Sequence, residues 1–231
     1  MCFKQNVPWS GRDVIKVIAI IHTGIIGFYF AFLVTIRNSE WTFMATRYAG
    51  SLLLGLLPYV WIKRKYLSPS YYLGFQKGKY KLFYPISIAI VSAIAYPILL
   101  NLLSITKHVP IRILEPDVPI WLYIMLYPLS IGGLAGVLLV PLSEEIFFRG
   151  FLYGYIRKNI SILPGLLIQS LIFSVLHLEL IYSKSVDMLI VTFIFGLVLG
   201  IFYEYTDSIY PSVVCHSIVN YMVFILSVYP I

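Results

Sequence analysis

The sequence predicts an all-α protein, a polytopic transmembrane bundle of about seven spans. Of its 231 residues, 60% are hydrophobic and only 12% are charged, about half the charge of a soluble domain. Five stretches contain no Asp, Glu, Lys or Arg and reach the roughly 20 residues that a helix needs to cross a bilayer. Since hydrocarbon offers no partner to a backbone amide, each stretch must satisfy its own amides as a helix.

The predicted spans follow one another with short connections. Two of the seven depart from the ideal: 41–62 is interrupted by Arg47, and 188–203 is short. The length of 118–143 leaves room for an eighth span. We expect a single membrane domain, residues 1–231. The five stretches without charge are 17–36, 82–105, 118–143, 159–178 and 208–231.

Positive charge is distributed unevenly between the connections. With the N-terminus in the cytoplasm, the inner connections hold eleven Lys and Arg residues and the outer ones four. This asymmetry predicts a multi-pass protein of the cell membrane with a cytoplasmic N-terminus, and it explains the net charge of +7 without nucleic acid as a partner. The inner residues are Lys4, Arg12, Lys16, Lys63, Arg64, Lys65, Lys77, Lys79, Lys81, Arg157 and Lys158, and the outer ones Arg37, Lys107, Arg112 and Lys184.

The unusual feature of this apolar chain is the segment 141–150, where two acids and an arginine lie within a predicted helix. One isolated charge at mid-membrane costs about 2.5–3.5 kcal/mol. Glu145 and Arg149 are four residues apart and can pair on one helix face. Glu144 is rotated by about 100° from Glu145. It remains a carboxylate in an apolar setting beside a second acid, which suits a general base.

Two other predicted spans carry polar residues at the same spacing. Phe173 shares a helix face with His177, and His216 shares one with Asn220. A carboxylate and an imidazole can hold and deprotonate a water, while a second imidazole and an amide can stabilise an oxyanion. Together these groups are suited to hydrolysing an acyl bond. Taken singly, each histidine and Asn220 could instead be an interhelical hydrogen bond, and Phe173 is interpreted as packing.

The depths of these residues along their spans disagree. Glu144 lies roughly 21 Å, and His177 roughly 24 Å, from the cytoplasmic ends of their helices. His216 lies only roughly 12 Å into the last span. Either that helix is tilted or starts deeper, or the predicted boundaries are wrong.

The motifs resemble those of a known family, the CAAX-protease and bacteriocin-processing membrane proteins. The family pattern is Glu-Glu-x-x-x-Arg, then Phe-x-x-x-His, then His-x-x-x-Asn on successive core helices. The sequence has all three in that order, and the resemblance covers roughly 118–231, while 1–117 corresponds to the variable part of such proteins. The matching residues are Glu144, Glu145, Arg149, Phe173, His177, His216 and Asn220.

This resemblance implies an intramembrane endopeptidase. Eukaryotic relatives remove the last three residues of prenylated C-terminal Cys-a-a-X proteins, and some prokaryotic relatives are tied to bacteriocin self-immunity. The expected partners are therefore a peptide or prenylated protein and the lipid bilayer. The implied catalytic residues are Glu144, Glu145, Arg149, His177, His216 and Asn220.

Two mechanisms use the same residues. In the first, Glu144 and His177 activate water without a metal. In the second, Glu144, His177 and His216 hold a zinc ion with an open position for water. We favour the first, with no cofactor required, because Asn220 has a role there as an oxyanion donor and is a poor zinc ligand.

Two non-enzymatic functions stay open as alternatives. An ion-coupled transporter also buries Glu, His and Asn near mid-membrane, although it would show repeated halves, and the sequence shows no such repeat. A bacteriocin-immunity or interaction protein could keep the fold without catalysis.

The predicted topology can be tested at Lys79. If the connection that holds Lys79 is cytoplasmic, a single cysteine placed there should resist an impermeant thiol reagent in intact cells and react after lysis. Labelling in intact cells would show that the topology is inverted. A single cysteine at Lys107, on the predicted outer side, is the matched control.

Overall fold

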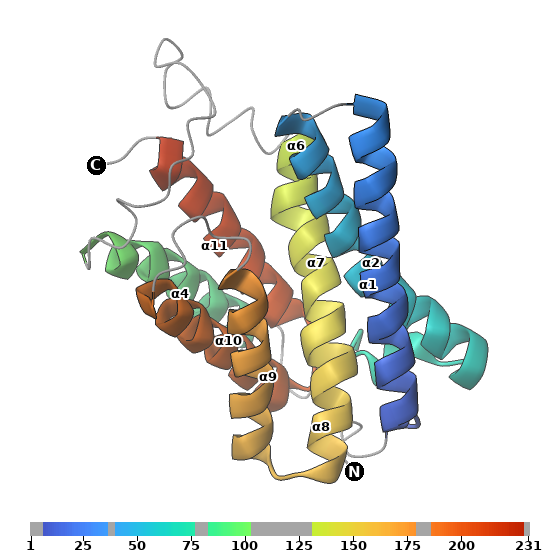
Figure 1. Cartoon of the computed structure of the whole chain (residues 1–231). Coiled ribbons are helices and arrows are strands. Elements are labelled where there is room, and N and C mark those ends of the chain that lie inside the picture. Colours follow the sequence, from blue (N-terminus) through green and yellow to red (C-terminus); the bar gives the residue numbers. More distant parts are fainter. Residues whose placement is uncertain (1–6, 37–39, 77–82, 103–130, 179–185, 229–231) are drawn as a thin grey trace.

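The computed structural model describes residues 7–36, 40–76, 83–102, 131–178 and 186–228 (Figure 1). Within these ranges all regular structure is helical, so the all-α prediction is confirmed. The connections that hold Lys77, Lys79, Lys81, Lys107 and Lys184, and the first half of 118–143, lie outside the described residues.

The helices overlap the predicted spans, with ends that differ by a few residues. They are α1 Gly11–Ile36, α2 Glu40–Tyr66, α4 Phe83–Leu102, α9 Ile162–Leu178, α10 Val186–Thr206 and α11 Tyr210–Val228. The four-residue α3 Pro69–Tyr72 lies in the connection predicted between the second and third spans. The charge-free stretch ends at residue 143, and the helix continues through the two acids and the arginine to Asn159, as the sequence predicts. The charges that end the apolar run are buried inside the protein, so they do not end the helix.

By length and composition, one described helix is apolar enough to cross a bilayer, the Leu189–Thr206 part of α10. A second apolar stretch, Ile162–His177 in α9, is shorter. The number of spans therefore remains a prediction.

The motif helix, which we call the rod, consists of five successive segments. They are α6 Ile131–Leu134, the π-helical η4 Ala135–Leu139, α7 Val140–Glu145, the π-helical η5 Ile146–Tyr153 and α8 Gly154–Asn159. The two acids thus lie at the end of a short α segment between two π-helical ones. Widened turns of this kind are frequent at functional sites.

Pro141 accounts for the first widened turn. A proline inside a helix has no N–H and its ring clashes with the carbonyl four residues earlier. In the rod, Val140 donates its N–H to the Ala135 carbonyl, five residues back. The Gly136 carbonyl is thereby released from the helical ladder, because the next amide belongs to Pro141. It must find a partner elsewhere.

Glycines lie at two close helix contacts, one between α2 and the rod and one between α10 and α9. A Cβ on Gly55 of α2 would lie 2.6 Å from Cα of Ser143 in the rod, and one on Gly196 of α10 would lie 3.2 Å from Cα of Ser170 in α9. Small residues let helix backbones approach in this way. In Figure 1, α1 and α2 cover one side of the rod, and α9, α10 and α11 lie on the other.

The segment before α1 is fixed to the same rod. Trp9 is fully buried, stacks on Phe151 at a ring-centroid distance of 5.3 Å and donates from its indole N–H to the Phe151 carbonyl at 3.1 Å. Lys158 contacts the Trp9 carbonyl at 3.5 Å. The chain start is therefore joined to the end of the rod opposite η4.

Asp13 joins α1 to α2. Its carboxylate accepts hydrogen bonds from Ser10, both N–H and hydroxyl, and from the side chains of Trp61, Lys65 and Tyr66. Asp13 lies outside the predicted span 17–36. Burial raises the pKa of Asp13, but the hydrogen bonds from Lys65, Ser10 and Tyr66 outweigh it and hold this pKa well below its ordinary value.

This arrangement predicts a pH-dependent contribution to stability. Because the folded pKa of Asp13 is lowered, its contribution is present above the unfolded pKa of about 4 and is lost as the pH falls toward the folded value. Asp13→Asn should lower the melting temperature of the detergent-solubilised protein at pH 7 by about 2–4 °C per kcal/mol lost. Its deficit relative to wild type should shrink as the pH falls from about 5 to about 3.

Lys16→Ala, a change at an exposed position of the same helix, is the control and should follow the wild-type pH response. A deficit for Asp13→Asn that stays constant over the whole acid range would contradict the assignment.

Candidate active site

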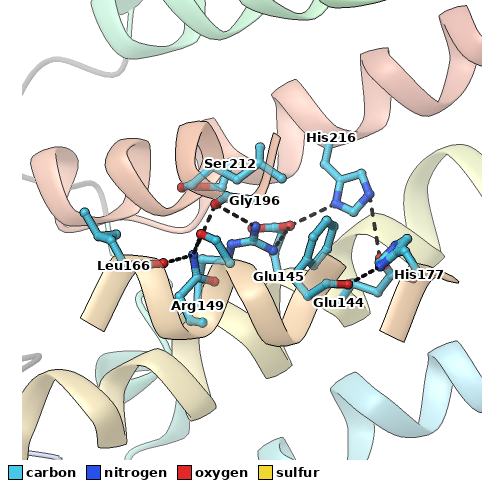
Figure 2. A network of polar contacts seen from close by, with 12 residues as sticks. Glu144, Glu145, Arg149, Leu166, His177, Gly196, Ser212 and His216 are labelled. Carbon is cyan, nitrogen blue, oxygen red and sulfur yellow. Dashed lines mark hydrogen bonds and ion pairs between the residues drawn. The ribbon is translucent and has the colours of Figure 1, made fainter. Parts of the chain in front are cut away.

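The two acids and the arginine of the rod are buried together. Arg149 donates from Nη1 to Glu145 Oε1 at 2.7 Å, and neither side chain is exposed. The second guanidinium nitrogen, Nη2, donates to the Gly196 carbonyl at 3.2 Å. Figure 2 shows how this contact fixes the guanidinium between the rod and α10. The ion pair expected from the spacing of four residues is present.

His216 of α11 contacts both acids. Its Nδ1 lies 2.9 Å from Glu145 Oε1, and its Nε2 lies 3.7 Å from Glu144 Oε2. A carboxylate oxygen accepts, so Nδ1 is the donor, and in the neutral ring Nε2 carries a lone pair. Glu145 therefore orients His216 as well as balancing Arg149, a second role that the sequence analysis did not include.

His177 of α9 approaches Glu144 from another helix. Its Nδ1 lies 2.7 Å from the Phe173 carbonyl, and its Nε2 lies 3.5 Å from Glu144 Oε2. A carbonyl can only accept, so His177 also presents an Nε2 lone pair to Glu144 when neutral. With 18% of its side chain exposed, His177 is more accessible than Glu144 or His216. It lies on the open side of the site.

Three lone-pair atoms thus converge near one point: Glu144 Oε2 and the Nε2 atoms of His177 and His216 (Figure 2). Acceptors that face one another need a proton, a water or a cation between them. The charges of Glu144, Glu145 and Arg149 sum to −1, so a single added proton makes the buried group neutral. The arrangement can hold a water and take a proton from it.

Asn220 lies one turn beyond His216 on α11 and is half-buried. Its Nδ2 donates to the Gly136 carbonyl at 3.3 Å, the carbonyl that Pro141 and the first widened turn release. One amide hydrogen of Asn220 therefore joins α11 to the rod. The second remains for another acceptor, and the role of Asn220 as an oxyanion donor stays a prediction.

The position at which α11 begins explains why the predicted depth of His216 differed from those of Glu144 and His177. Ser208 and Ile209, which precede it, are fully buried. Ile209 donates its N–H to the Gly74 carbonyl at 2.9 Å, and Ser208 donates its hydroxyl to the Gln76 carbonyl at 2.7 Å. The helix therefore begins inside the protein, and it crosses the rod obliquely in Figure 1. This start brings His216 level with Glu144.

The sequence analysis did not predict the contacts of two residues in the site. Phe173, interpreted as packing, contacts both histidine rings and the Arg149 guanidinium. Gln169, fully buried, donates to the Gly196 carbonyl at 3.1 Å, the same acceptor that Arg149 uses. The spacing of Phe173 from His177, and an amide in an otherwise apolar span, were the available signals.

Comparison with known proteins gives one family. Residues 121–222 match the family described as type II CAAX prenyl endopeptidase Rce1-like, and they fall within the part of the chain on which the resemblance rests. No curated protein and no solved structure matches the chain. Proteins of this family are integral to membranes and act there on peptide or prenylated protein substrates. Through residues 121–222, the chain is similar to the Rce1-like family of type II CAAX prenyl endopeptidases.

Proposed function

We propose that the protein is an intramembrane endopeptidase that hydrolyses a peptide bond with water activated by Glu144 and His177. The observation that carries this proposal is the convergence of Glu144 Oε2 with the Nε2 atoms of His177 and His216, at 3.5 and 3.7 Å. The proposal includes a multi-pass topology of seven spans with a cytoplasmic N-terminus. It also includes a prenylated Cys-a-a-X protein as the substrate class.

The reaction begins with a water held between Glu144 and His177. Glu144 takes one proton, and the hydroxide oxygen forms a bond to the scissile carbonyl carbon, which becomes tetrahedral. Negative charge then develops on the carbonyl oxygen, where His216 and Asn220 donate hydrogen bonds. As the C–N bond breaks, the proton held by Glu144 moves to the leaving amine, which restores the carboxylate.

His216 can donate from Nε2 only when both of its ring nitrogens are protonated, because Nδ1–H is already directed at Glu145. Glu145 and Arg149 are positioning residues. Glu145 holds His216 in one orientation, and Arg149 prevents two carboxylates from facing each other without a counter-charge.

A metal-dependent mechanism would use the same three atoms. Imidazole nitrogens and a carboxylate oxygen are suitable zinc donors, and zinc would supply an activated water. The described part of the chain has no group of three or more His, Cys, Asp or Glu side chains arranged to hold a metal ion. We keep the metal-free mechanism as the proposal, because it gives Asn220 a role as an oxyanion donor.

Proteolysis by the purified protein tests this function. A prenylated Cys-a-a-X peptide should lose its last three residues. Glu144→Gln and His177→Ala should reduce kcat/KM by at least about 10²-fold, the lower end of acid–base contributions. Asn220→Ala should reduce it by about 10²–10³-fold.

The matched control is Glu204→Gln, another partly buried carboxylate, which pairs with Tyr153 and Arg157 on the rod and should retain activity. Equal turnover by wild type and Glu144→Gln would rule out the assignment. Absence of cleavage, together with substrate-coupled ion uptake into proteoliposomes, would favour the transporter alternative.

Chelation distinguishes the two mechanisms. Activity should survive prolonged treatment with a zinc chelator, followed by removal of the chelator and any metal. Loss of turnover that is restored by one equivalent of zinc would reassign Glu144, His177 and His216 as metal ligands.

The buried ion pair predicts a rescue experiment. Arg149→Ala leaves the Glu145 charge buried and should cost about 3–5 kcal/mol of folding free energy, measured as a lower yield of monodisperse protein. Adding Glu145→Gln removes that charge and should restore part of the yield. Activity should stay low in the double variant, because a neutral amide orients His216 less firmly than a carboxylate does. If the yield of the double variant were no higher than that of Arg149→Ala alone, the result would count against the pairing.

A further inference from the structure

Phe173 has an unusual position among the charged residues of the site. Its ring is fully buried. The His177 ring lies 4.1 Å from it, centroid to centroid, at an interplanar angle of 35°. The Arg149 guanidinium carbon lies over the same ring, 4.6 Å from its centroid. The edge contact with His216 is longer, at 5.9 Å and 74°.

The two short contacts use opposite faces of one ring. An imidazole at 4.1 Å with a small tilt covers one face, so a guanidinium at 4.6 Å must lie over the other. Phe173 therefore stands between the positive charge of Arg149 and the pair formed by His177 and Glu144. The negative face of the ring attracts the guanidinium, which keeps Arg149 within reach of Glu145 and the Gly196 carbonyl.

The backbone of the same residue acts on the same histidine. The Phe173 carbonyl accepts from His177 Nδ1 at 2.7 Å. The carbonyl thus determines which ring nitrogen carries the hydrogen, and the ring determines the plane in which the imidazole lies. The carbonyl and the ring favour the same arrangement, because both leave the Nε2 lone pair of His177 facing Glu144 at 3.5 Å.

We propose that Phe173 is a positioning residue that separates Arg149 from the water-activating pair and fixes the tautomer and orientation of His177. This inference rests on the proposed function. It explains why Arg149 neutralises Glu145 more closely than the adjacent buried acid Glu144. If Arg149 approached Glu144 as well, that carboxylate would become a weaker base for water.

Truncation at two phenylalanines separates this role from simple packing. Phe173→Leu and Phe151→Leu remove the same ring from fully buried sites on the motif helices, but Phe151 contacts Trp9 rather than the histidines. Both variants should lose similar thermal stability. Only Phe173→Leu should lower kcat, by about tenfold or more with little change in KM. Equal losses of kcat in the two variants would overturn the proposal.

Fluorinated phenylalanines at the two positions test the separation of charge. They keep the shape of the ring and weaken its attraction for a cation. Activity should fall stepwise with fluorination at 173 and should not change at 151. Undiminished activity with pentafluorophenylalanine at 173 would overturn the proposed contact with Arg149.

Nitrogen-15 NMR of labelled histidines reports on His177 without turnover. Wild type and Phe151→Leu should show sharp His177 signals with an unprotonated Nε2. Phe173→Leu keeps the backbone carbonyl and should keep this tautomer, but its His177 signals should broaden because the imidazole is no longer held in one plane. Equally sharp His177 signals in all three proteins would overturn the inference. If the expected NMR pattern appears but no Glu144-dependent cleavage is found, the proposed function fails and the role of Phe173 stands.

Discussion

The ion pair between Glu145 and Arg149 is the interaction on which the rest of the site depends. Two adjacent acids in an apolar bundle would be prohibitively costly without a buried cation. Arg149 is this cation, but it does not approach the two acids equally, because its second contact is the Gly196 carbonyl of α10. The pair thereby determines where α10 must lie, and through Glu145 it also determines the orientation of His216.

The irregular shape of the rod complements this pair. Pro141 forces a widened turn just before the acids, and the carbonyl released there is satisfied by Asn220 of α11. The same helix carries His216, one turn away. A backbone defect on one helix and a side-chain amide on another thus fix the register between them. The polar chemistry and the helix packing are therefore parts of one arrangement, and neither can be altered alone.

The lengths of the uncharged apolar stretches predicted the helices, and the polar residues within them brought Glu144, Glu145, Arg149 and both histidines into one hypothesis. They could not predict the depth of His216, because a helix that starts inside the protein leaves no compositional mark at Tyr210. Nor could they predict the hydrogen bond from Asn220 to the Gly136 carbonyl. That carbonyl is available because of a widened helical turn, and such turns depend on packing as well as on Pro141. Ring contacts such as those of Phe173 depend on tertiary distances that no spacing rule supplies.

The burial of Trp9 has a consequence for the order of synthesis. Its indole N–H bonds to a carbonyl 142 residues later in the chain, so the N-terminal segment cannot reach its final position until the rod has been made. During synthesis α1 and α2 are therefore made well before the helix that fixes them in place. The two parts of the chain are therefore interdependent in assembly, although the residues proposed to perform chemistry all belong to the later part.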